Sequence, residues 1–186
     1  FRSVYDYQKT LSRLSQSLST FLEMPQLVDT VVQTLIVTMN LDRVAVLVKN
    51  FDTGIYEIQK TIGFDETNGI SLVKDNYLTD FLSQNQKILV LEEIEKRLLE
   101  TTNHRQQTAL SSLINHMRHI EAGLVIPVIK SNNLISLIVL GNKKNQDPYS
   151  VQDIALLQEI SLQAAVAIEN AMLYRKVNQF NHELQT

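Results

Sequence analysis

The sequence predicts a domain of the α+β (α/β) class, with an antiparallel sheet of five to six strands between helices and a long helix at each end. Apolar segments occur in pairs joined by short polar turns, and connections this short join antiparallel neighbours. The central segments are apolar on both faces, so helices must cover both sides of the sheet. Apolar residues at both ends of the chain recur every three and four positions, which is typical of helices packed along other helices.

Composition excludes several classes of function. The chain has 186 residues, of which 44% are hydrophobic and 20% charged, as in ordinary globular domains. A net charge of -3 gives no general attraction to nucleic acid or anionic membranes. The absence of cysteine removes disulfides, thiolate metal sites and thioether-linked cofactors. Since we find no run of 18 apolar residues, we predict no direct membrane insertion. The start at Phe1 and the polar final helix suggest a piece of a longer protein.

The first predicted helix lies in residues 1–22. Its apolar positions form a narrow stripe, which predicts packing along another helix rather than on a broad core. The stripe consists of Leu11, Leu14, Leu18 and Phe21. Pro25 fits the first turn of a second helix, whose wider apolar face runs from Leu27 to Met39.

Alternating apolar residues predict two hairpins. The strands are expected at residues 43–49, 55–62, 123–130 and 134–141. Asp52 to Gly54 and Ser131 to Asn133 supply the turns. The second strand has a polar face, which places it nearer an edge of the sheet.

The segment between the hairpins is expected to be mainly helical. Helices are predicted at residues 76–84, 92–99 and 108–120, and a short strand at 87–91. The polar run 101–107 is interpreted as a mobile loop.

The last helix is predicted to begin after Ser150 and to run to the end of the chain. Ser150 and Asp153 have capping-box spacing, and Tyr149 is placed to pack on Ile154 as a hydrophobic staple. Its second half carries a heptad stripe of Val166, Asn170, Leu173, Val177 and Phe180. Together with the first helix, this stripe predicts a homodimer, in which polar Asn170 fixes the register.

The ordered set of segments resembles a GAF domain, a small-molecule-sensing module of signalling proteins. The resemblance rests on "LDRVAVLVKNFDTGIYEI", Gly63 with Phe64, "GLVIPVIKSNNLISLIVLGNK" and "PYSVQDIALLQEISLQAAVAIENAMLY". It implies an N-terminal signalling helix (1–22), a GAF domain (23–172) and a coiled-coil linker helix (173–186). It also implies a cytoplasmic location, either in a soluble protein or in the cytoplasmic part of a membrane-anchored receptor. The expected function is a non-catalytic sensor that is covalently attached to an output module such as a histidine kinase.

A ligand pocket, if one exists, is expected between the sheet and the inserted helices, because the terminal helices fill the other face. The ligand itself is an unknown small molecule. The candidate lining residues are Tyr77, Phe81, Leu110, Leu113, Met117 and His116. Ordinary core packing explains the same pattern, so a ligand-free dimerisation and relay module is the alternative.

Other chemistries are disfavoured by particular residues. Cyclic-nucleotide-binding GAF domains of cyclases or phosphodiesterases share an Asn-Lys, Phe, Asp-Glu signature. Asn142 and Lys143 match it, but Tyr149 replaces Phe and Ile154 replaces Glu. The family's bilin and methionine sulfoxide chemistries need cysteine. His104, His116 and His119 are too few to predict a metal or haem site, so no cofactor is expected. The sequence shows no nucleophile and base pair, paired carboxylate motif or phosphate-binding Gly loop, so no catalytic residue is expected.

Overall fold

A computed structural model describes residues 4–65 and 77–185. The helices are α1 (Val4–Thr20), α2 (Met24–Met39), α3 (Tyr77–Asn85), α4 (Leu91–Glu100), α5 (His104–His119) and α6 (Val151–Gln185). The strands are β1 (Val44–Lys49), β2 (Tyr56–Ile62), β3 (Leu89–Val90), β4 (Leu124–Lys130) and β5 (Asn133–Leu140). These elements confirm the predicted fold class. Asn76, the expected first residue of the third helix, lies outside the described residues.

The strands of the described residues form one antiparallel sheet in the order β2-β1-β5-β4-β3. Both predicted hairpins are present, and β2 is an edge strand as expected. The β4–β5 turn is tight because Ser131 and Asn132 both have positive φ, at 50° and 65°. Positive φ at both central residues is the geometry that matches the twist of hairpin strands.

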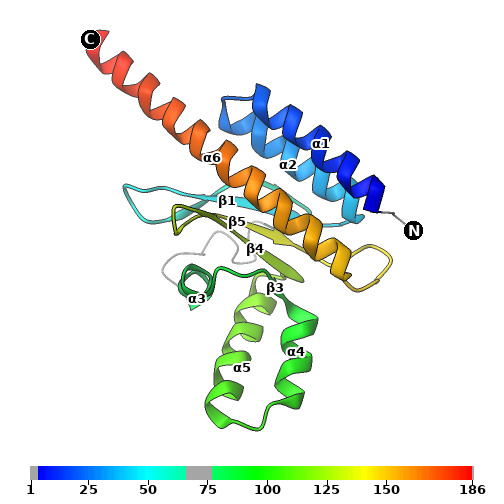
Figure 1. Ribbon diagram of the computed structural model, residues 1–186. Helices are drawn as coiled ribbons and strands as arrows, with labels where there is room; N and C mark the ends of the chain where they lie inside the picture. Colours follow the sequence, from blue (N-terminus) through cyan, green and yellow to red (C-terminus); the bar gives the residue numbers. More distant parts are fainter. Residues whose placement is uncertain (1–3, 66–76, 186) are drawn as a thin grey trace.

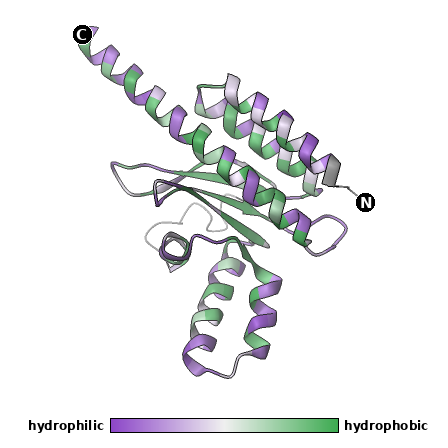
Figure 2. Ribbon diagram, viewed as in Figure 1, coloured by the Kyte–Doolittle hydropathy of each residue, from purple (hydrophilic) through white to green (hydrophobic). Residues whose placement is uncertain are grey.

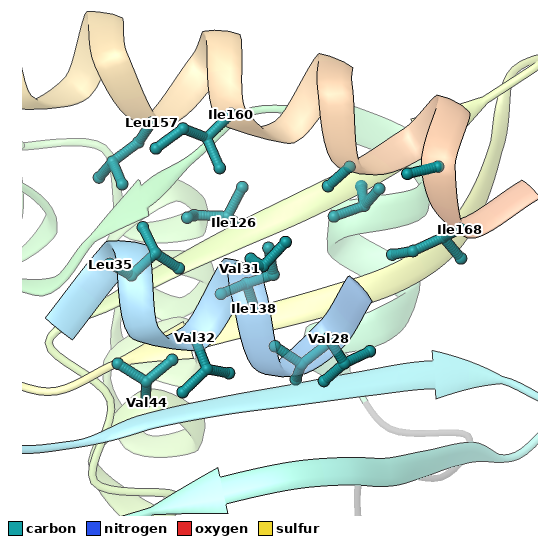
Figure 3. Packing of buried hydrophobic residues seen from close by; sticks show 14 of the residues in the cluster. Val28, Val31, Val32, Leu35, Val44, Ile126, Ile138, Leu157, Ile160 and Ile168 are labelled. Carbon is teal, nitrogen blue, oxygen red and sulfur yellow. The ribbon is translucent and has the colours of Figure 1, made fainter. Parts of the chain in front are cut away.

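Helices α1, α2 and α6 cover one face of the sheet (Figure 1). Alternate residues of β1, β4 and β5 point to this side, as the two-residue period of a strand requires. They form the larger core with the apolar stripes of α2 and α6. Figure 3 shows its centre, with Val28, Val31, Val32, Leu35, Val44, Ile126, Ile138, Leu157, Ile160 and Ile168 packed together.

The opposite face carries the inserted helices, as predicted. The remaining residues of the central strands, including Leu47, Leu137 and Val139, are fully buried there in a second core with apolar residues of α3 and α5. The α4–α5 hairpin projects away from the sheet instead of lying flat on it (Figure 1).

The start of α5 corrects one prediction. The expected loop over residues 101–107 ends at Asn103, because α5 begins four residues earlier than predicted, at His104. Oδ1 of Asn103 accepts hydrogen bonds from the backbone N–H groups of Arg105 and Gln106, at 3.0 and 3.2 Å. This N-cap outweighs the polar composition of the first helical turn.

Candidate functional site

Three of the predicted pocket residues form an aromatic cluster on α3 and α5. Tyr77 and Phe81 lie one turn apart on α3, with ring centres 6.3 Å apart. The His116 ring of α5 lies 5.4 Å from that of Tyr77. Tyr77 is 38% exposed and His116 is partly buried, so the edge of this cluster is open to solvent.

A backbone hydrogen bond orients His116 within this cluster. Its Nδ1 lies 2.7 Å from the carbonyl oxygen of Ser112, one turn earlier on α5. Because a carbonyl oxygen only accepts, Nδ1 carries the hydrogen in this contact. The cluster therefore combines aromatic faces with a fixed imidazole and a phenol.

The other three predicted pocket residues lie deeper. Leu110, Leu113 and Met117 are buried in the second core, and Met117 has no exposed surface. They pack with the sheet in the core against which Phe81 of the aromatic cluster also packs. The structure thus brings the six predicted residues to one side of the sheet, three of them buried and three at least partly exposed.

A separate groove of about 360 Å³ lies between α4 and α5. It is lined by Glu95, Leu98, Leu99, Ser111, Ile114, Asn115 and Arg118. None of the six predicted pocket residues lines it. An ion pair of 3.1 Å between Arg118 and Glu95 connects its two helices.

The three histidines of the insert are the candidate metal ligands in the sequence. Among residues 4–65 and 77–185, no group of three or more His, Asp or Glu side chains could hold a metal ion. His104 begins α5 and His119 ends it, so the length of that helix separates them.

The beginning of α6 is built around one buried carboxylate, that of Asp153, which is 1% exposed. The backbone N–H of Ser150 donates to Asp153 Oδ2 at 2.8 Å, and the Asp153 N–H donates to Ser150 Oγ at 3.0 Å. These two bonds confirm the predicted capping box.

Two further side chains bind the same carboxylate. Lys143 Nζ lies 2.5 Å from Oδ2, and the Tyr7 hydroxyl of α1 donates to Oδ1 at 2.5 Å. Burial raises the pKa of Asp153, but the hydrogen bonds from Lys143, Tyr7 and Ser150 and the charge of Lys143 outweigh it. The pKa is therefore below its ordinary value, and the group is a buried anion at neutral pH.

Sequence reasoning missed these two partners. A buried carboxylate at a helix start calls for a counter-charge. That requirement is a usable signal for Lys143. The pairing of Tyr7 with Asp153 spans 146 positions, and no local pattern indicates it.

Tyr149 lies beside this carboxylate. Its hydroxyl donates to the Gly141 carbonyl oxygen at 2.5 Å, and its ring packs against the larger core. Burial and the neighbouring charges of Asp153 and Asp42 raise its pKa. In this chain Lys143 and Asp153, together with Tyr149 at the Phe position of the cyclic-nucleotide signature, therefore hold the end of β5 and the start of α6 together.

The stripe predicted on the first helix packs against other elements of the same chain. Leu14 and Leu18 are only 2% and 6% exposed, and Leu11 and Phe21 pack partly buried against the same core. The helices along which this stripe packs are α2 and α6 of the same chain, so the stripe itself gives no argument for a homodimer.

The stripe on α6 is different, because it stays exposed: from Leu173 on, every described residue of α6 is exposed. Leu173 and Phe180 are 55% and 60% exposed, and Asn170 is exposed between them and the domain. The exposed apolar residues along α6 include Leu162, Val166, Leu173, Val177, Phe180 and Leu184. Figure 2 shows apolar and polar residues alternating along the part of α6 that extends beyond the sheet.

By length and composition alone, α6 could cross a membrane. Its most apolar window has a mean hydropathy of 1.2, but 44% of that window is buried inside the domain. A helix that forms part of a globular core passes the same test.

Comparison with known proteins identifies the family. The sequence model of the GAF domain matches residues 23–168. Hybrid signal transduction histidine kinase G of Dictyostelium discoideum is 35% identical over 60 residues, which are 32% of this chain. The matched segment spans only 2% of that kinase.

Solved structures share the fold. The GAF domain of an Acinetobacter phosphoenolpyruvate-protein phosphotransferase has a TM-score of 0.65 at 16% identity, over 91% of this chain and 97% of that one. The GAF domain of the potassium sensor histidine kinase of Escherichia coli has a TM-score of 0.56 at 14% identity, over 91% and 98%. With the family match over most of its length, this chain belongs to the GAF domain family, whose members are generally regulatory, non-catalytic modules of signalling proteins.

Proposed function

We propose that this chain is a non-catalytic sensor domain of a larger signal-transduction protein, such as a sensor histidine kinase, and that α6 carries its output. The observation that carries this proposal is the continuity of α6. One helix of 35 residues starts in the domain core and ends with an exposed apolar stripe. A rigid helix of this kind transmits a shift of the domain to whatever follows it.

The output requires a partner for the exposed stripe, and a second copy of this chain fits it. Apolar residues spaced four and three apart are self-complementary in a parallel pair of helices. The partner helix would cover the exposed stripe of α6. The α1 helix is left out of this interface, since its own stripe is already buried.

Sedimentation velocity tests the dimer. Replacing Val177 and Phe180 with Glu places two charges in the stripe, and we expect monomers with an unchanged fold. Asn178→Glu is the matched control, since Asn178 is exposed on another side of the same helix. A wild-type protein that stays monomeric at high micromolar concentration, or a double variant that still dimerises, contradicts the proposed pairing.

The input is a small molecule held at the cluster of Tyr77, Phe81 and His116. Aromatic rings beside an apolar core bind a flat apolar body, and the imidazole and phenol fix its orientation. The buried packing of Leu113 and Met117 favours the alternative, a relay module that works without a ligand.

Native mass spectrometry of freshly purified protein separates these two functions. A bound small molecule supports the sensor, and the variant pair Tyr77→Ala and His116→Ala should lose it. Tyr174→Ala on α6 is the control that should retain it. The ligand-free relay is favoured if only the bare mass appears after expression under varied conditions.

A further inference from the structure

Helix α1 contacts the output helix at the place where that helix begins. The Tyr7 hydroxyl donates to Asp153 Oδ1, and Leu14 and Leu18 pack into the core that α6 shares. Helices α1 and α6 lie side by side over the same face of the sheet (Figure 1). The contact therefore connects the N-terminal region of the chain with its C-terminal helix.

Groups from three parts of the chain bind the carboxylate of Asp153. One oxygen accepts from Tyr7, and the other binds Lys143 and the Ser150 N–H. Tyr7 belongs to α1, Lys143 to the segment after β5, and Ser150 to the start of α6. In a buried network each bond polarises and orients the others, so losing one partner changes how firmly the carboxylate holds the rest.

We propose that α1 is a second control point of this domain, and that a displacement of α1 shifts the first turn of α6 through Tyr7 and Asp153. This route lies on the opposite side of the sheet from the aromatic cluster, so it works without a ligand. Its regulatory meaning rests on the proposal that α6 carries the output. The coupling itself requires neither a ligand nor a dimer.

Hydrogen–deuterium exchange of the whole chain tests the coupling. In Tyr7→Phe we expect amides of both α1 and residues 150–157 to exchange about tenfold faster, the effect of losing one hydrogen bond to a charged group. Amides of β4 and β5 should keep their wild-type rates. The matched control removes a tyrosine hydroxyl elsewhere on α6: Tyr174→Phe should change the exchange of neither segment.

The reverse experiment separates coupling from a local packing role. Coupling between two sites is reciprocal, so a change at the α6 start must also reach α1. In Lys143→Met, which removes the ion pair with Asp153, α1 amides should exchange faster together with residues 150–157. If the α6 start loosens while α1 keeps its wild-type rates, the coupling does not exist, whatever the outcome of the dimer and ligand experiments. Uniformly faster exchange in every segment would also overturn it, since that is the signature of global destabilisation.

Discussion

Ser150 shows how one side chain supports the start of α6. Its Oγ accepts from the Asp153 N–H, one of the backbone donors that a helix start leaves without an internal partner. We expect Ser150→Ala to lower the free energy of unfolding by about 1 kcal/mol, the usual effect of losing an N-cap. Urea denaturation followed by circular dichroism measures it.

Ligand behaviour should be unchanged in this variant, because Ser150 acts on the helix start alone. Ser150→Thr keeps the hydroxyl and should restore most of the stability. If Ser150→Ala removed binding of a cyclic nucleotide at unchanged stability, the capping explanation would be wrong.

Asp153 links stability to pH. Its pKa in the folded protein is below the ordinary value of 3.8, so folding favours the ionised form. The stability it contributes is fully present above that ordinary value and is lost as pH falls through the folded pKa. We expect the free energy of unfolding to decrease below about pH 4. Denaturant titrations at a series of pH values measure this decrease.

Two variants assign the pH dependence to this carboxylate. Asp153→Asn should be less stable at pH 7, and its free energy of unfolding should decrease less than that of the wild type as the pH falls. Asp52→Asn changes an exposed carboxylate in a turn and should retain the wild-type profile. An unchanged acid profile in Asp153→Asn would show that other groups dominate acid unfolding.

At the scale of elements, α1 behaves as part of the core. Leu14 is almost fully buried between α1 and its neighbours. We therefore expect Leu14→Ala to lower the free energy of unfolding by about 2 to 5 kcal/mol, because it leaves a cavity. Thermal unfolding measures the loss. Ser15→Ala, at an exposed position of the same helix, should change stability little. If the Leu14→Ala protein kept wild-type stability but failed to dimerise, Leu14 would belong to a dimer interface rather than to the core.

The elements differ in how well their sequences predict them. Strands β1, β4 and β5 were predictable because their alternating residues are apolar on both faces, and the turn at Ser131 and Asn132 has clear turn chemistry. The start of α5 was not predictable, because an Asn followed by His, Arg and Gln has the polar composition of a loop.

The α1 stripe shows a different limit. A spacing of three and four residues requires a neighbouring helix, but it does not say whether that helix belongs to the same chain. Leu14 and Leu18 find their neighbours within the chain, while the similar stripe at Leu173 and Phe180 stays exposed. The candidate pocket has the same ambiguity, since the apolar spacing of Leu113 and Met117 fits a core as well as a cavity floor.

For the whole molecule, the sheet separates the two functional sides. Phe81 of the aromatic cluster packs against the core on one face, and α1, α2 and α6 lie on the other. Strand β5 contributes residues to both faces, and only Gly141 to Ser150 separate its end from α6. Lys143 and Tyr149 fix this short connection to the helix and to the strand end. A shift of β5 therefore has a short covalent path to α6.

Asn170 is placed to make the proposed output of α6 sensitive to register. It lies on the exposed stripe where α6 leaves the domain, and a polar residue in a helix pair favours some alignments over others at a cost in stability. We expect Asn170→Leu to strengthen the dimer, because an apolar residue then completes the stripe. Sedimentation equilibrium measures the change.

The same variant should weaken signalling, because a ligand acts only through its different affinities for two helix arrangements. A stripe that is apolar throughout distinguishes less sharply between them. Fusing α6 to a histidine kinase output and measuring activity with and without ligand tests this, with Asn178→Leu on another side of the helix as the control. If Asn170→Leu keeps the full ligand response in a stable dimer, the register of the paired helices is not the signal, and a rotation or separation of the two α6 helices must carry it instead.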